Sequence, residues 1–310
     1  GLADLGNVYN DGALSNRNVI INGEFLVWQR SDNGYSGGGQ AYVSADRFTT
    51  TRGRIRKPNT NVNTGEDNRG AVFDTTDGNV YAHFDYAVED VGQTLNGKTM
   101  TFSFYAKVLS GGTTLLLEDT GGDHLDFGGN RYITLTSNWE RYTVTGTLVS
   151  TGASSGVVMP RLYLNPTGVA EPRMIQVDQF QLEVGDTATP FEHRSYGQEL
   201  ALCLRYFNKL TYGANDTPIL NAAYYNSAGA YGSVSLQTEM RVYPTLVVSA
   251  ASDFKSLSNG SSKIPTSINI SGSSTKNPEL VIATAGHVQG HAAFLRTNNT
   301  SAVMTLDAEL

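Results

Sequence analysis

The sequence predicts an all-β protein, and three observations support this prediction. Glycine contributes 33 of the 310 residues, and charged residues make up only 16%. Such a composition is typical of many short strands joined by tight turns. Apolar and polar residues also alternate along many segments, as they do on half-buried strands. The third observation is the length, which is comfortable for two domains that each bury a core.

The first half of the chain is expected to form one β domain after a short stem. Residues 1–17 have a few spaced apolar residues but no period, so we expect a stem that needs partners. The clearest strand is MTFSFYAKV, whose apolar members Met100, Phe102, Phe104, Ala106 and Val108 point one way. Further strands are expected in residues 139–148 and 157–164 and in a strand that ends at Val184. Residues 18–190 are therefore predicted to form a β-sandwich.

One segment near the middle of the chain has helical spacing. Turn residues fill Gly185 to Pro190, and Ser195 with Gln198 three residues later forms a predicted capping box. An apolar stripe then follows at helical spacing: Leu200, Cys203, Leu204 and Phe207. We therefore expect a short linker helix within residues 191–210. Because Leu202 and Tyr206 lie off the stripe, burial requires either threefold packing in a homotrimer or a position between two sandwiches of one chain.

A second β-sandwich is expected in residues 211–310. The segment GSVSLQTEMRV alternates most regularly, with Val234, Leu236, Met240 and Val242 on one face. Further strands are expected at 246–250, 264–270, 280–284, 292–297 and 303–310.

Charge and hydropathy exclude several classes of partner. The net charge is −7, and the only basic run is RGRIRK at residues 52–57, so we expect no nucleic-acid binding. No apolar run approaches the roughly 20 residues of a membrane span, so we expect no membrane insertion. Cys203 is the only cysteine and is expected to be a small buried hydrophobe. The start at Gly1 without methionine suggests that an upstream shaft precedes this chain.

Three stretches resemble one known family. LEVGDTATPFEHRSYGQELALCLRYF, from residue 182, resembles the junction in tail-fibre and receptor-binding proteins of bacteriophages and prophages. NVIINGEFLVWQRSDNGY at 18–35, with SADRF at 44–48, resembles the start of that family's carbohydrate-binding-module-like domain. The closing MTLDAEL resembles the end of fibre tips, which would make Leu310 the native end. The segment 211–300 matches no specific motif.

The resemblance implies a jelly roll for residues 18–190, a linker helix, a β-sandwich tip and a homotrimer. It also implies location in the virion tail fibre, extracellular when acting, attached to an upstream phage tail component. The implied activity is non-catalytic adhesion to a host cell-surface polysaccharide or lipopolysaccharide. Two alternatives remain open: a polysaccharide depolymerase, and a structural collar or shaft component without ligand.

Tyrosines beside small and polar residues are the candidate glycan contacts, because a flat ring stacks on the apolar face of a pyranose. In the tip the candidates are Tyr224, Tyr225, Asn226 and Tyr231, in a segment without strict alternation that could expose its rings. In the jelly roll they are Tyr35, His124, Arg131 and Tyr132. We place recognition in the tip. The alternative for each ring is an ordinary strand residue.

Asp178 is the candidate metal ligand. It is in phase with Phe180, Leu182 and Val184, so it is predicted to face the core, where a carboxylate needs a cation. The resemblance implies that Asp178 and Glu24 hold a structural Ca²⁺, and no other cofactor is expected. The alternative is an internal salt bridge, for instance with Arg30 or Arg47.

Three other patterns suggest chemistry less specifically. Glu118, Asp119, Asp123 and Asp126 surround His124 and could serve hydrolysis, cation binding or a solvated loop. A G-x-S-x-G match at 152–156 lies in a Ser/Gly/Thr loop rather than at the strand-to-helix turn that the motif requires. His287 and His291 are interpreted as turn histidines.

Overall fold

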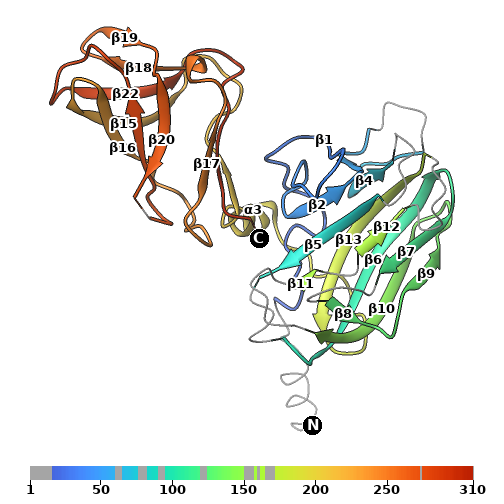
Figure 1. Ribbon diagram of the computed structural model, residues 1–310. Helices are drawn as coiled ribbons and strands as arrows, with labels where there is room; N and C mark the ends of the chain where they lie inside the picture. Colours follow the sequence, from blue (N-terminus) through green and yellow to red (C-terminus); the bar gives the residue numbers. More distant parts are fainter. Residues whose placement is uncertain are drawn as a thin grey trace. The chain divides into compact units, whose positions relative to one another are not determined.

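The computed structural model describes residues 16–59, 65–75, 82–89, 95–118, 124–149, 157–158, 161–164, 172–272 and 274–309 (Figure 1). The chain divides into two compact units, one ending at Leu200 and the other running from Ala201 to Glu309. Each unit has its own hydrophobic cluster. No helix among the described residues is long and apolar enough to cross a membrane.

The first unit is a β-sandwich, as the sequence predicted. Within the described residues, one sheet has the order β1 (Asn33–Tyr35), β3 (Arg54–Arg56), β4 (Ala71–Asp74), β13 (Met174–Val184), β6 (Thr99–Ser110), β10 (Glu140–Val149) and β8 (His124–Asp126). The other has the order β11 (Val157–Val158), β5 (His83–Val88), β12 (Arg161–Tyr163), β7 (Thr114–Glu118) and β9 (Arg131–Thr134), with β2 (Phe48–Thr51) paired to β5. The central pair, β6 and β13, is antiparallel.

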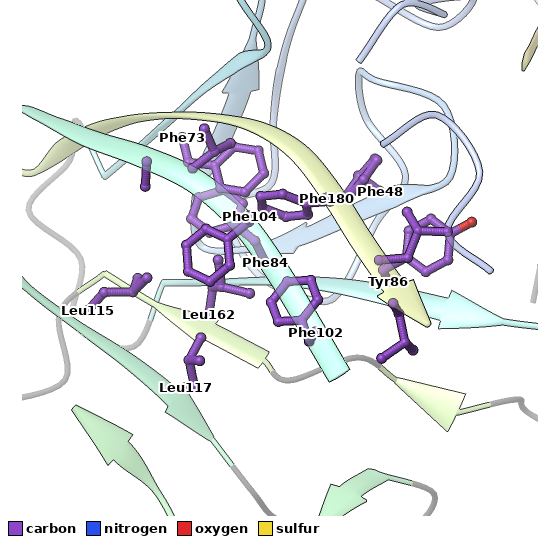
Figure 2. Packing of buried hydrophobic residues seen from close by; sticks show 14 of the residues in the cluster. Phe48, Phe73, Phe84, Tyr86, Phe102, Phe104, Leu115, Leu117, Leu162 and Phe180 are labelled. Atoms are coloured by element: carbon purple, nitrogen blue, oxygen red, sulfur yellow. The ribbon is translucent and has the colours of Figure 1, made fainter. Parts of the chain in front are cut away.

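Aromatic rings from both sheets fill the core of the first unit (Figure 2). Phe180 lies at the centre and makes edge contacts with Phe102 and Phe73 at centroid distances of 5.6 and 6.1 Å. From the other sheet, Phe84 stacks on Phe73 at 4.1 Å. The predicted alternation of β6 is confirmed, because Met100, Phe102, Phe104 and Ala106 all belong to this core and Val108 packs against it. Burial of these rings from water is the main stabilising contribution in this unit.

The helix α3 (Tyr196–Cys203) is shorter than the stripe suggested. Its capping box is confirmed: Gln198 Oε1 accepts the Ser195 N–H at 2.9 Å, and Ser195 Oγ accepts the Gln198 N–H at 3.3 Å. Phe207, however, begins strand β14 (Phe207–Lys209) and pairs with Asp307. Pairing with a distant strand therefore overrides the helical spacing at this position. The Cys203 thiol is buried, as expected.

The segment before α3 is tied to the start of the first unit. The Glu192 carboxylate accepts the backbone N–H of Asn18 at 2.8 Å, and Glu199 accepts that of Asn22 at 2.8 Å. Arg194 donates to the Ile20 carbonyl at 3.1 Å. Part of the predicted linker thus belongs to the hydrogen-bonded framework of the first unit.

The second unit also packs two sheets on one core. In the described part of the chain, β14, β23 (Met304–Asp307) and β17 (Thr245–Val248) form one sheet. The larger sheet has the order β19 (Ser261–Lys263), β18 (Phe254–Ser258), β22 (Ala292–Thr297), β15 (Pro218–Asn226), β16 (Gly229–Ser233), β21 (Glu279–Ala283) and β20 (Ser267–Ser271). A short 3-10 helix, η1 (Ala251–Asp253), precedes β18. The all-β prediction is confirmed.

One predicted strand of this unit is wrong. Residues 234–242 are not a strand, although Val234, Leu236 and Met240 are buried as the alternation indicated. Their backbone N–H groups donate to the carbonyls of Pro278, Lys276 and Thr275, so the segment runs beside residues 275–278 without forming a regular ladder. Val242 is 41% exposed.

Candidate functional site

A groove opens on the larger sheet of the second unit. It lies over β15 and β16, the paired strands labelled in Figure 1. Its volume is about 780 Å³. The described residues that line it are Ala223, Tyr224, Tyr225, Tyr231, Glu279, Gln289 and Gly290. We call this set the tyrosine groove. Three of the four tip residues proposed from the sequence thus line one hollow.

Adjacent residues on a strand face opposite sides, so Tyr225 is exposed on the face opposite to the buried Tyr224. A β-bulge also shifts the pairing here. Ala223 pairs with Tyr231 and Tyr224 with Ala230, but the register shifts before Asn226, so Tyr225 is the extra residue on β15. Tyr225 is 70% exposed and Tyr231 is 40% exposed. Their ring centroids lie 5.9 Å apart with an interplanar angle of 78°. The two rings therefore form an edge-to-face pair on the solvent side of the sheet.

Tyr224 has a different role from its neighbour. It is only 1% exposed, and its hydroxyl is 2.6 Å from the Ser256 hydroxyl on β18. The ring of His287 lies against it at a centroid distance of 4.4 Å. Tyr224 therefore supports the floor of the groove from the core side. The sequence predicts an exposed ring at this position, but the ring face of Tyr224 is covered.

The connection between β21 and β22 supplies the remaining wall. The Gly290 N–H donates to the Tyr224 carbonyl at 2.8 Å, and the Tyr224 N–H donates to the His291 carbonyl at 3.0 Å. Gly290 has φ +82°, a conformation that L side chains rarely adopt. Burial lowers the pKa of His287, and the positive charge of Lys263 lowers it further. These contacts fix the place of Gln289 beside the tyrosine pair.

Polar groups around the groove are uncommitted. Neither the Glu279 carboxylate nor the Gln289 amide has a hydrogen bond or ion pair within the described part of the chain, and the same holds for the hydroxyls of Tyr225 and Tyr231. Asn226 instead closes the turn after β15, because its side-chain oxygen accepts the Ala228 N–H at 2.9 Å. The groove thus combines exposed ring faces with free donors and acceptors.

The four jelly-roll candidates do not form one site. Tyr35 ends β1 with the Arg54 guanidinium 5.9 Å from its ring, and His124 begins β8, at the opposite edge of the same sheet. Tyr132, which is 64% exposed, lies on β9, the edge of the other sheet. Arg131 precedes it and donates to the Phe127 carbonyl at 2.7 Å.

Asp178 is buried, but it does not face the core. Asp178 pairs with Tyr105, whereas Gln181 pairs with Ser103, so one extra residue is inserted into β13 between them. The bulge carries Gln179 at φ +55°. Residues beyond it, such as Phe180, face the core, and Asp178 lies on the opposite face. The predicted phase was wrong because it ran through this bulge.

Arg69 is the salt-bridge partner of Asp178, in place of the predicted Arg30 or Arg47. The Arg69 guanidinium lies 3.1 Å from Asp178 Oδ2, and Oδ1 accepts the Gln179 N–H at 2.9 Å. Burial raises the pKa of Asp178 to about 6 despite Arg69, and the nearby Glu24 carboxylate adds to the rise. Glu24 itself is 2.7 Å from His193 Nδ1.

These contacts bear on the proposed Ca²⁺ site. Both Asp178 oxygens already accept hydrogen bonds, while Ca²⁺ takes six to eight oxygen ligands. In the part of the chain that the structure describes, no three His, Cys, Asp or Glu side chains are grouped to hold a metal ion. The Ca²⁺ site stays a prediction.

The acidic loop does not present a carboxylate pair in the described residues. Glu118 belongs to β7, in one sheet, and Asp126 to β8, in the other. Glu118 forms an ion pair with Arg161 at 3.2 Å, and Asp126 accepts the Gly128 N–H at 2.9 Å. Asp119 and Asp123, like the G-x-S-x-G match and the stem 1–15, lie outside the described residues.

A polar row that sequence reasoning missed crosses the sheet of β5, β12 and β7. Asp85 is fully buried, and Arg161 Nε lies 2.7 Å from its Oδ1. Burial raises the pKa of Asp85, and His83 and Arg161 oppose that rise. In the sequence, polar residues alternate with an apolar one in HFD (83–85) and in RLY (161–163), which was the available signal for this row. Only the strand register shows that the two segments pair.

Comparison with known proteins identifies no family. No family model matches the chain, and no curated protein matches it. Among solved structures, TmCBM61 in complex with β-1,4-galactotriose has 16% identity and a TM-score of 0.30, over 55% of this chain and 99% of that one. The CBM22 tandem domain of Paenibacillus barcinonensis Xyn10C has 10% identity and a TM-score of 0.27, over 96% and 100%.

A baseplate protein is also among the similar structures. The tripod from the baseplate of bacteriophage Tuc2009 has 11% identity and a TM-score of 0.27, over 76% of this chain and 83% of that one. At these TM-scores the similarities do not establish a shared ligand or a shared assembly.

Proposed function

We propose that this protein is a non-catalytic bacteriophage tail-fibre adhesin that binds a host cell-surface glycan in the tyrosine groove. The observation that supports this most directly is the Tyr225–Tyr231 pair, exposed on the sheet and surrounded by uncommitted polar groups. Exposed rings give up the stability that burial would provide. A surface that keeps two of them together, beside free donors and acceptors, suits a ligand that is apolar on its faces and polar at its rim.

A pyranose has these properties. Its C–H face can stack on one ring while the edge-to-face partner contacts its side, and its hydroxyls can bond to Glu279, Gln289 and the tyrosine hydroxyls. No bond is made or broken in this proposal. The resemblance of residues 18–208 to tail-fibre proteins supports the proposed place in a virion, joined to an upstream tail component.

The proposed fibre is a homotrimer. Leu200, Leu202 and Leu204, on and just after α3, are only partly buried in the single chain, and a partner chain could cover them. Three linked copies of a weak site bind a surface more tightly than one, because binding at one raises the effective concentration of the others. Light scattering of the full chain should report about three times 33.4 kDa, and Leu204→Asp should lower that mass. A monomer at micromolar concentration would contradict this assembly.

Binding of the whole 310-residue chain to a glycan array tests the site itself. Tyr225→Ala and Tyr231→Ala should each weaken binding by about 1 to 3 kcal/mol. Tyr212→Ala is the matched control, since Tyr212 is 75% exposed in the same unit but does not line the groove. Equal losses in all three variants, or no glycan bound by the unaltered chain, would refute the proposed site.

Release of reducing sugar separates adhesion from depolymerisation. The unaltered chain should bind the glycan without shortening it. Shortened products would instead support an enzyme, whose carboxylates would then have to be found by substitution.

A further inference from the structure

The charge of the tyrosine groove is one-sided. Of its described lining residues, Glu279 alone carries a charge. Every Lys and Arg of the second unit lies outside the lining: Arg205, Lys209, Arg241, Lys255, Lys263, Lys276 and Arg296. The Glu279 carboxylate is therefore the one charge in the described lining, while the charge of Lys263 acts on His287, beneath Tyr224.

Several of those cations are held elsewhere. Lys255 and Arg296 both pair with Asp216, at 2.7 and 3.4 Å. Lys276 Nζ donates to the Gln237 carbonyl at 2.8 Å. Arg241 donates to the Ala308 carbonyl at 3.1 Å. Each of these four side chains would have to break its present contact in order to turn toward the groove.

Strand register places Glu279 beside the ring pair. Tyr231 on β16 pairs with Val281 on β21, and Ser233 pairs with Glu279. Side chains two residues apart on a strand share a face, so Glu279 is a diagonal neighbour of Tyr231, at about 7 to 8 Å between backbones. The half-buried Glu279 carboxylate has no partner among the described residues. It is therefore free to act on whatever stacks against the tyrosines.

We infer that Glu279 is a specificity-determining residue and that the groove selects uncharged pyranoses over acidic ones. This inference rests on the proposed glycan binding. The carboxylate can accept hydrogen bonds from two adjacent hydroxyls of a neutral sugar, and such charge-assisted bonds are stronger than neutral ones. The carboxylate of a uronic acid, or a phosphate, would instead stand near a like charge at a partly dry surface. Repulsion there is screened less than in bulk water.

The test uses the whole 310-residue chain and pairs of array tetrasaccharides. The members of a pair share linkage and length but carry either a hexose or the corresponding uronic acid. The unaltered chain should bind the hexose member at least about tenfold more tightly, which corresponds to a modest like-charge penalty. Glu279→Gln keeps the size and hydrogen-bonding capacity of the side chain. It should bring the two affinities to within about threefold by strengthening binding of the acidic member.

A control substitution and a salt series complete the design. Glu239→Gln removes a carboxylate of the same unit that bonds Thr275 outside the groove, and it should leave the preference unchanged. Raising the ionic strength should reduce the ratio of hexose affinity to uronic acid affinity for the unaltered chain. The same ratio for Glu279→Gln should not change.

The outcomes separate this inference from the proposed function. Glycan binding that needs Tyr225 but favours the acidic members, or a preference that Glu279→Gln does not change, would overturn the inference and leave the proposed function standing. Absence of binding to every member of the array would overturn both.

Discussion

The core of the first unit and the tyrosine groove of the second use aromatic rings in opposite ways. In the first unit, Phe180 and the rings around it lie between the sheets and hold them together (Figure 2). In the second unit, Tyr225, Tyr231 and Phe294 lie on the solvent side of the larger sheet, above a core that is mostly aliphatic. A ring in the core stabilises the fold, while a ring on the surface is available to a ligand. We therefore expect substitutions in the first unit to affect stability, and those on the groove to affect binding.

The largest expected difference is between Phe180 and Phe294. Phe180→Ala should lower the free energy of unfolding of the first unit by about 3 to 5 kcal/mol, because it leaves a cavity at the centre of the core. Phe294→Ala, at a residue that is 47% exposed, should cost well under that. Amide hydrogen exchange of β6 and β13, compared with β15 and β22, measures the two units separately. Similar losses for both variants would contradict the comparison.

The same contrast can be made within two adjacent residues. Tyr224→Ala should destabilise the second unit by about 3 kcal/mol, and Tyr224→Phe by about 1 kcal/mol through loss of the contact with Ser256. Tyr225→Ala should leave the melting temperature nearly unchanged while glycan binding falls. A melting temperature that drops as much for Tyr225→Ala as for Tyr224→Ala would show that the exposed ring is structural.

Asp178 tests whether the buried charge of the first unit stabilises it. Its pKa of about 6 lies above the ordinary value of 3.8, so between these values the folded state binds more protons. The free energy of unfolding should therefore fall as the pH rises from about 4 to 6. Asp178→Asn should remove this slope and raise stability at pH 7 by about 1 to 2 kcal/mol, as measured by denaturant unfolding.

The same variant distinguishes a bound Ca²⁺. If Asp178 held the ion, chelator would lower the melting temperature of the unaltered chain, and Asp178→Asn would be less stable rather than more stable. A melting curve that is unaffected by chelator would leave Asp178 as the partner of Arg69.

The smallest effect is expected at His287, below the groove. Its pKa lies under the ordinary 6.5, so at pH values between the two the unfolded state binds more protons. Stability of the second unit should therefore fall as the pH drops below about 6.5. His287→Gln should flatten this dependence of the melting temperature. An unchanged pH profile in that variant would assign the effect to another group.

Sequence alone was sufficient for the all-β class, the two cores, the alternation of β6 and the capping box at Ser195. Those features depend on local propensity and on a period of two along one strand. The sequence did not predict either of the two β-bulges, in β13 and in β15. One inserted residue in β13 turned Asp178 away from the core, and one in β15 shifts the pairing with β16 after Tyr224.

The groove was likewise decided by tertiary structure. Tyr231, Glu279 and Gln289 come from three separate segments, and strand pairing sets which side chains become neighbours. The physical reason is that alternation predicts the face of a residue only relative to its neighbours on the same strand. A single inserted residue reverses that face for the rest of the strand, and the choice of partner strand depends on how the whole sheet packs on its core.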